Sequence, residues 1–479
     1  MKIVTAMRRL SQGVLLSILA TFVSAAHGQT TLAWEQTKYF QYNIHNVTVT
    51  PYTAPGSSPG SWTVKVIFSV SNPVAGGVHW DIKTAAPFQT SPANLTLDIA
   101  WDDMEITNRG SAGALLLPIL TTSRGAGAAM PAQVRGLQAK DASPAATPAT
   151  PCASSGDCPP LDSTQLVNSY WVEKVVTPVP ATLTSTVTTG RVAIEGRLVC
   201  KDDATGLSPA LGCPTAAPYP NIPVKSATAS FAFTKSDAAM ISTQRRQIVD
   251  IAKCKGCHDD QKHGDTIVPR LSLHGANRNE NLDLCVVCHN PNQTDVPYRY
   301  YDPLKDPRIG GPETPIDFKT MVHSIHAGGF RKTPFVVIGF NSSVNDFSDV
   351  RFPSELRKSC LKCHVVDAAT GKGSYELPLK SAVLGTTVNT QSAYLAPGGS
   401  PQRSIDVNPA NDLKITPTAA TCSACHDSSE VRSHMIKTGG ASFGTTQDKI
   451  GTTVKERCAN CHGPGKDKDV RKVHELSSR

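Results

Sequence analysis

The pentapeptide CKGCH at residues 254–258 is the first of five copies of the pattern C-x-x-C-H in the second half of this 479-residue chain. The other copies are CVVCH at 285–289, CLKCH at 360–364, CSACH at 422–426 and CANCH at 458–462. With 14 Cys and 14 His in the chain, composition alone predicts about 0.01 such pentapeptides by chance. The repetition therefore indicates a functional motif.

The spacing of the motif fits covalent haem attachment. Two cysteines three positions apart lie on the same side of a helical turn, so both thiols can bond one porphyrin edge while the next histidine binds the iron. Zinc sites also use C-x-x-C, but they join two such pairs and need no histidine directly after the second cysteine. We therefore predict five covalently bound haem c groups. Thioether attachment is assigned to Cys254, Cys257, Cys285, Cys288, Cys360, Cys363, Cys422, Cys425, Cys458 and Cys461, and iron ligation to His258, His289, His364, His426 and His462.

The number of remaining histidines bears on the sixth ligand of each iron, because catalysis at a haem needs an open position. Six histidines outside the motifs follow residue 240: His263, His274, His323, His326, His434 and His474. Six candidates exceed five irons, so every haem can be ligated by two histidines. His323 and His326 are three apart on an expected helix and can serve two different haems. His263 is interpreted as the spare, and His45 and His79 in the first half as structural.

Residues 1–28 have the pattern of an export signal. Lys2, Arg8 and Arg9 precede an apolar stretch from Val14 to Ala26 that ends in small residues. This stretch of about 13 residues is too short to span a bilayer as a helix, and no later segment reaches the roughly 18 that are needed. We expect an exported chain with no integral membrane segment.

The formal charge of +8 does not indicate nucleic-acid binding. Removing the three basic residues of the signal lowers the charge to +5, and five ferric haems, each about −1 with ionised propionates, bring it to about zero. The lysines and arginines are scattered rather than gathered in one stripe. Nucleic acid is therefore excluded as a partner.

The first half of the chain shows the period-two pattern of half-buried strands. Apolar and polar residues alternate from Trp62 to Val70 and again from Leu95 to Ile99, and the runs at 181–199 and 224–233 are rich in Thr and Val. We predict an all-β domain over residues 29–240, either a Greek-key barrel or a sandwich.

Two segments of this half have a different composition. Ala, Pro, Ser and Gly dominate from about residue 123 to 162, which predicts a mobile surface loop. Four cysteines outside the motifs form an even set, which in an exported protein usually forms disulfides. The short spacings favour the pairs Cys152 with Cys158 and Cys200 with Cys213.

The second half, residues 241–479, is predicted to be a mostly helical and irregular pentahaem domain. AAMISTQRRQIVDIAK from Ala238 predicts a helix that leads into the first motif, and the strand pattern then fades. Five haems should take the place of a conventional core. In a globule of this size they average about 10 Å edge to edge, which allows electron tunnelling.

Six stretches of this half match a known pattern: RRQIVDIAKCKGCH from Arg245, LHGANR from Leu273, CVVCHNPNQTD from Cys285, DFKTMVHSIHAGG from Asp317, DFSDVRFPSELRKSCLKCH from Asp346 and CHGPGKDKDVRKVH from Cys461. They resemble the pentahaem domains of the OmcA/MtrC family of outer-membrane multihaem cytochromes. GRVAIEG from Gly190 and IPVKSATASFAF from Ile222 resemble the β-domain that precedes such a haem domain.

The resemblance implies distal ligation by His274, His323, His326, His434 and His474, with His263 in an extra loop. The family carries electrons from the periplasm or outer membrane to extracellular acceptors such as ferric minerals and soluble flavins. Redox partners would be periplasmic or outer-membrane cytochromes. Family members typically have ten haems and are often lipoproteins, whereas this chain has five motifs and no cysteine before Cys152. It therefore resembles a single pentahaem-domain member.

The sequence is consistent with two main interpretations of function and with a third, a β-domain binding module in which the haems serve only as structural staples. The first is an exported pentahaem electron-transfer protein at the cell surface or outside the cell, or in the periplasm, which includes a terminal metal reductase. The alternative is a multihaem oxidoreductase, such as a nitrogen- or sulfur-oxyanion reductase, with one open-coordinate haem. No catalytic residue is predicted for either. A high-spin haem signal would favour the enzyme.

Overall fold

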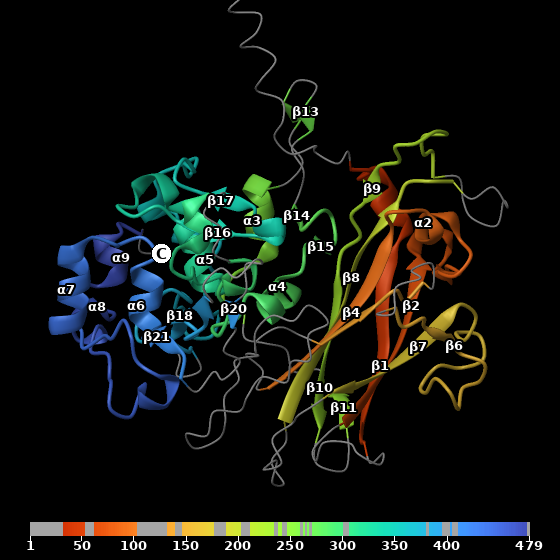
Figure 1. Cartoon of the computed structure of the whole chain (residues 1–479), viewed down its shortest axis with the longest axis horizontal. Helices are drawn as coiled ribbons and strands as arrows, with labels where there is room; N and C mark the ends of the chain where they lie inside the picture. The colour runs from red at the N-terminus through yellow and green to blue at the C-terminus, as the bar shows by residue number, and fades with distance from the viewer. Residues whose placement is uncertain are drawn as a thin grey trace, which may run out of the picture.

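The computed structural model describes residues 32–52, 62–102, 132–138, 146–176, 188–202, 211–233, 238–241, 247–258, 262–263, 266–267, 271–299, 306–379, 383–394, 403–404 and 411–476. The predicted export signal, residues 1–28, lies outside these ranges. A β-rich part and a part that carries the five motifs lie side by side (Figure 1). No helix in the described ranges is long and apolar enough to cross a bilayer.

The β-rich part consists of two antiparallel sheets. The first has the strand order β1-β2-β7-β6, with β3 paired to β2, and the second has the order β11-β10-β8-β4-β5, with β9 paired to β8. The bounds are β1 Gln41–Pro51, β2 Trp62–Asn72, β3 Val78–His79, β4 Asn94–Asp102, β5 Ala132–Arg135, β6 Thr150–Pro151, β7 Ser169–Val176, β8 Thr188–Val199, β9 Asn221–Ile222, β10 Ala227–Phe233 and β11 Ala238–Ile241.

One apolar cluster lies between the two sheets and forms the main core. Val64, Val66 and Phe68 of β2 enter it from the first sheet, and Leu95 and Leu97 of β4 enter it from the second. All five side chains are fully buried. The alternation in the sequence thus predicted the inward faces of these strands. Of the two predicted forms, the structure has the sandwich.

Two predictions for this part are corrected. The helix expected from Ala238 is wrong at its start, because residues 238–241 form β11 against β10 and α3 begins only at Ile251. The stretch 123–162 is not one continuous surface loop, since its described residues include β5, which pairs with β4, and the buried Leu137 and Ala149. In both cases strand pairing with distant residues overrides local composition.

Both predicted disulfides are present. Cys152 is bonded to Cys158, and Cys200 to Cys213. The first bridge closes the turn before β7, and the second joins the end of β8 to the segment before β9.

The part with the motifs contains short elements and much irregular chain, so its predicted irregularity is seen but a mostly helical domain is not confirmed. Each motif needs only one helical turn, and the described helices here have four to nine residues. They are α3 Ile251–His258, α4 Leu282–Cys288, α5 Phe318–His326, α6 Pro417–Cys422, α7 Ser429–Lys437, α8 Ala459–His462 and α9 Val470–Val473; α2, Ala86–Gln89, belongs to the β-rich part. The two-stranded ladders are β12 Lys262–His263 with β13 Thr266–Ile267, β14 Ser272–Leu273 with β15 Arg278–Asn279, β16 Val336–Ile338 with β17 Val344–Asp346, β18 Thr386–Asn389 with β21 Leu413–Ile415, and β19 Ala393–Tyr394 with β20 Arg403–Ser404.

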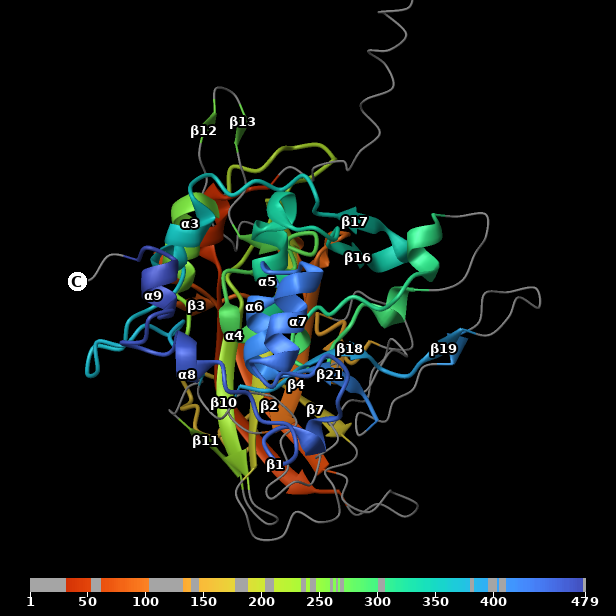
Figure 2. The ribbon, with the colours of Figure 1, turned by 90° about the vertical axis from the view of Figure 1, so that its left-hand side faces the viewer.

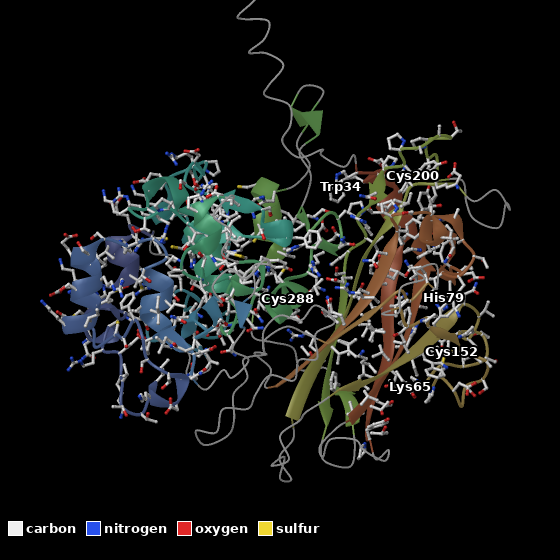
Figure 3. All side chains as sticks on the ribbon, in the orientation of Figure 1. Trp34, Lys65, His79, Cys152, Cys200 and Cys288 are labelled. Carbon is white, nitrogen blue, oxygen red and sulfur yellow. A yellow bond between two sulfur atoms is a disulfide. The ribbon has the colours of Figure 1, made fainter. Side chains whose placement is uncertain are left out.

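The second sheet supports the segment of the second motif directly. The backbone N–H of Gly196 donates to the carbonyl of Asn277 at 2.8 Å, and Ala100 of β4 packs on Val287 and Cys288 of α4. Cys288 accordingly lies between the two parts of the molecule (Figure 3). Turned by 90°, the molecule shows α4, α5 and α6 in front of the sheets (Figure 2).

Candidate haem centres

Each motif folds as a single turn that places its two thiols beside its histidine. In four motifs the backbone N–H of the histidine donates to the carbonyl of the first cysteine, four residues earlier, and the first motif lies within α3. These bonds run from His289 to Cys285, His364 to Cys360, His426 to Cys422 and His462 to Cys458, at 2.8 to 2.9 Å. None of the ten motif cysteines forms a disulfide.

Every motif histidine faces one histidine from outside the motifs. The ring centroids are 6.0 Å apart for His258 with His326, His274 with His289, His323 with His364 and His426 with His474, and 6.2 Å apart for His434 with His462. The five outer histidines are the five that the family resemblance implied. The sixth candidate, His263, has a side chain outside the described residues.

This separation fits two imidazoles on opposite faces of one metal. With each nitrogen about 2 Å from the metal, the ring centroids lie about 6 Å apart. The separation alone does not define a haem site, because His45 and His79 of the first sheet are 5.9 Å apart without a C-x-x-C pair in β1 or β3. The combination of ring pair and motif is what fits haem c.

Hydrogen bonds orient several of these rings. Nδ1 of His289 lies 2.9 Å from the carbonyl of Ile316, and Nδ1 of His326 lies 2.8 Å from that of Val322. Similar contacts join His462 to Lys468 and His474 to Arg357 at 3.0 and 3.1 Å. An Nδ1–H that donates to a carbonyl fixes the tautomer and leaves Nε2 as the metal ligand.

The surroundings favour the neutral, ligating form of these rings. Burial lowers the pKa of His289 and of His323 below the usual value. Burial, and then the neighbouring His323, lowers the pKa of His364 to about 4. An uncharged imidazole retains the lone pair that binds a metal.

A cavity of about 2360 Å³ runs between the elements that carry the motifs. Sites for one small ligand usually measure about 300–1,000 Å³, so this cavity has room for more than one prosthetic group. Its lining includes the motif histidines His289, His364, His426 and His462 and the outer histidines His323, His326, His434 and His474. The described residues of this part bury only small apolar clusters, as expected where haems replace a core.

Contacts connect neighbouring motifs into one array. The N–H of Phe318, at the start of α5, donates to the carbonyl of His289, and α5 then supplies the partners of two further motif histidines. Sγ of Cys425 in the fourth motif lies 3.9 Å from the carbonyl of His323. The carboxylate of Glu456, just before the fifth motif, accepts hydrogen bonds from the first turn of α6, which leads to the fourth motif.

Sequence reasoning did not identify which outer histidine faces which motif. It also missed the buried acidic residues Asp98 and Glu195 next to the second motif. The sequence did contain one signal, opposite charges in two of the quoted stretches. Glu195 lies in GRVAIEG and Arg278 lies in LHGANR, and the two side chains form an ion pair.

A fold with five one-turn C-x-x-C-H motifs, each facing a second histidine, is that of a multihaem c-type cytochrome. Residues 246–475 match the family model described as outer membrane cytochrome MtrC/MtrF-like, domains II/IV. These residues, which hold all five motifs, belong to the OmcA/MtrC family of outer-membrane multihaem cytochromes, and the expected resemblance is confirmed for this part of the chain.

One similar solved structure is the crystal structure of the outer membrane decaheme cytochrome OmcA, with 18% sequence identity and a TM-score of 0.38. The similarity covers 91% of this chain and 48% of the OmcA chain, so this chain spans about half the length of that protein. No curated protein sequence matches the chain.

Proposed function

We propose that this chain is an exported pentahaem c-type cytochrome that carries electrons through five haems, each ligated by two histidines. The observation that supports this most is the pairing of all five motif histidines with a second imidazole about 6 Å away. When bound, such a haem supplies an iron that exchanges electrons while both axial positions stay closed.

The residues of the chain then have two tasks. The ten motif cysteines hold the groups covalently, and the histidine pairs hold each iron between two imidazoles. The contacts that link the second motif through α5 to the others keep the five sites within one continuous array. An array of closely spaced carriers conducts, so electron transfer is the natural activity of this arrangement.

The same pairing favours a carrier over the alternative, an oxidoreductase with an open-coordinate haem. Among the described residues, each motif histidine faces another histidine, so a haem iron held by such a pair would offer no site to a nitrogen or sulfur oxyanion. We therefore assign no catalytic residue.

Family membership supports the direction of transfer. We propose that the protein works at the cell surface or outside the cell, receives electrons from periplasmic or outer-membrane cytochromes and passes them to extracellular acceptors such as ferric minerals or flavins. The alternative location is the periplasm, which is equally consistent with an export signal.

Haem quantification and low-temperature spectra of the purified holoprotein test the proposal. We expect five haems per chain by pyridine haemochrome and wholly low-spin spectra in both redox states. The double variant His45→Ala/His79→Ala is the matched control, because it removes a ring pair of the same separation without a motif, and it should keep five low-spin haems. Fewer than five haems, or a high-spin signal in the wild-type protein, would refute the proposal.

A further inference from the structure

Two acidic side chains are buried where the second sheet meets the part with the motifs. Asp98 of β4 is 0% exposed and Glu195 of β8 is 3% exposed. In the antiparallel register Asp98 lies opposite Ala193 and Thr96 lies opposite Glu195, so the two carboxyls are diagonal neighbours on one face. Two like charges in such a place disfavour full ionisation.

Arg278 is paired directly with one of these carboxyls. Nη2 of Arg278, in β15, donates to Oε1 of Glu195 at 2.7 Å, and its Nε lies 2.5 Å from Oε2. Oδ1 of Asp98 accepts a hydrogen bond from Gln133 at 2.8 Å, Oδ2 has no N–H donor among the described residues, and the carboxyl of Glu195 lies within hydrogen-bonding range of Asp98. A buried oxygen without a donor is suited to carry a proton of its own.

Other charged and titratable groups face the cluster from the neighbouring strands and from α4. Arg135 of β5 donates to Gln133 at 2.9 Å and its charge also acts on Asp98, while Tyr42 of β1 lies within electrostatic range of Glu195. Arg191 of β8 lies 3.4 Å from Asp283 of α4. Arg278 bonds one of the two carboxyls directly, and burial of both favours the neutral form of a carboxyl, so the pair is suited to bind a proton.

The cluster lies beside the second motif. Burial raises the pKa of the Cys288 thiol above its usual value and Asp98 and Glu195 raise it further, so both carboxyls are within electrostatic range of this haem-binding sulfur. Arg278 follows His274 by four residues in the same hairpin, and His274 faces His289. A change of charge at that ring pair therefore changes the electrostatic potential at the carboxyls, because the region between them is poorly solvated.

We propose that Asp98 and Glu195 form a proton-accepting site that takes up one proton when an electron arrives at the His274–His289 centre. The inference deepens the proposed function and rests on it. One electron comes from the donor cytochrome or an added reductant, and one proton comes from water and adds to a carboxylate oxygen of the pair. The proton is released when the electron leaves, so the charge of the region is balanced in both states.

The acid–base properties of the pair are consistent with this role. Burial, and then the charge of Asp98, raises the pKa of Glu195 to about 8, and burial raises the pKa of Asp98. The pair therefore titrates close to neutral pH, and an added negative charge nearby shifts it toward the protonated form.

Potentiometric titration of the holoprotein at several pH values between 6 and 9 tests the inference. In the wild-type protein we expect one of five potentials to fall with rising pH, by at most about 59 mV for each tenfold drop in proton concentration. Glu195→Gln and Asp98→Asn should each remove that dependence, because a single carboxyl beside Arg278 stays ionised. Glu173→Gln, the same chemical change at an exposed position of β7, should keep it.

A second readout follows the proton itself. Redox-induced infrared difference spectra of the wild-type protein should gain a protonated carboxyl band on reduction, sensitive to D₂O and lost in Glu195→Gln. An unchanged pH dependence in both variants, or no such band in the wild-type protein, would overturn the inference. If a variant binds fewer than five haems, the inference is tested by whether the wild-type protein shows the protonated carboxyl band on reduction. A wild-type protein with five low-spin haems and no pH-dependent potential would contradict this inference alone. A high-spin haem in the wild-type protein would contradict the proposed function.

Discussion

His323 and His326 lie one turn apart on α5, yet their rings face motif histidines from two different segments. His323 faces His364 of the third motif, and His326 faces His258 of the first. The same helix begins with a backbone bond to His289 of the second motif. A helix of nine residues thus connects three of the five centres.

The single variants His323→Ala and His326→Ala should each open one axial position at a different iron. Electron paramagnetic resonance should show one high-spin and four low-spin haems in each variant, and two high-spin haems in the double variant. His263→Ala serves as the control and should keep five low-spin haems. A double variant that resembles either single variant would show that both histidines serve one haem.

His434→Met should raise one midpoint potential and leave the other four close to their original values. Thioether sulfur stabilises ferrous iron better than a second imidazole does, so a His/Met pair has the higher potential. A potentiometric titration followed by optical spectra measures this. If all five potentials remain unchanged, His434 is not the partner of His462.

Loss of the disulfide between Cys200 and Cys213 should destabilise the β-rich part. The bridge spans 13 residues, and a loop of this length contributes about 3 kcal/mol through the unfolded chain. All five tryptophans lie in this part, so their fluorescence during denaturant unfolding reports on it. The variant Cys152→Ser/Cys158→Ser, which opens a shorter loop, should cost less; an equal or larger loss would contradict the loop-length argument.

His45 should make the β-rich part sensitive to acid. Burial, and then the neighbouring His79, lowers its folded-state pKa from 6.5 to about 4. Between these values the unfolded chain binds a proton that the folded chain does not, so stability falls as the pH drops through this window. The wild-type protein should lose thermal stability from pH 6.5 to 4, and His45→Gln should show a weaker loss. Gln41→Ala, on the same strand, should behave like the wild-type protein.

The sequence predicted the features that local spacing determines. The pentapeptide itself places two thiols and an imidazole on one turn, and the alternation in β2 and β4 predicted the buried faces of the sandwich. Both disulfides followed from short separations along the chain.

Features that depend on contacts between distant residues could not be predicted in this way. Nothing local to His326 selects His258 over the other motif histidines. In GRVAIEG the alternation places Glu195 opposite to the buried Val192 and Ile194, which predicts an exposed carboxylate. It is buried because the segment that carries Arg278 covers that face of the sheet. The strand β11 was missed for a similar reason, since its partner β10 decides its conformation.

The ion pair between Arg278 and Glu195 has a consequence for dissecting the molecule into fragments. A cut between residues 241 and 247 would strip the β-sandwich of the guanidinium that offsets its buried acids, and would expose the underside of α4 to water. Neither fragment should therefore fold as an autonomous unit with native solubility. The sandwich and the cytochrome half need to be produced as one polypeptide.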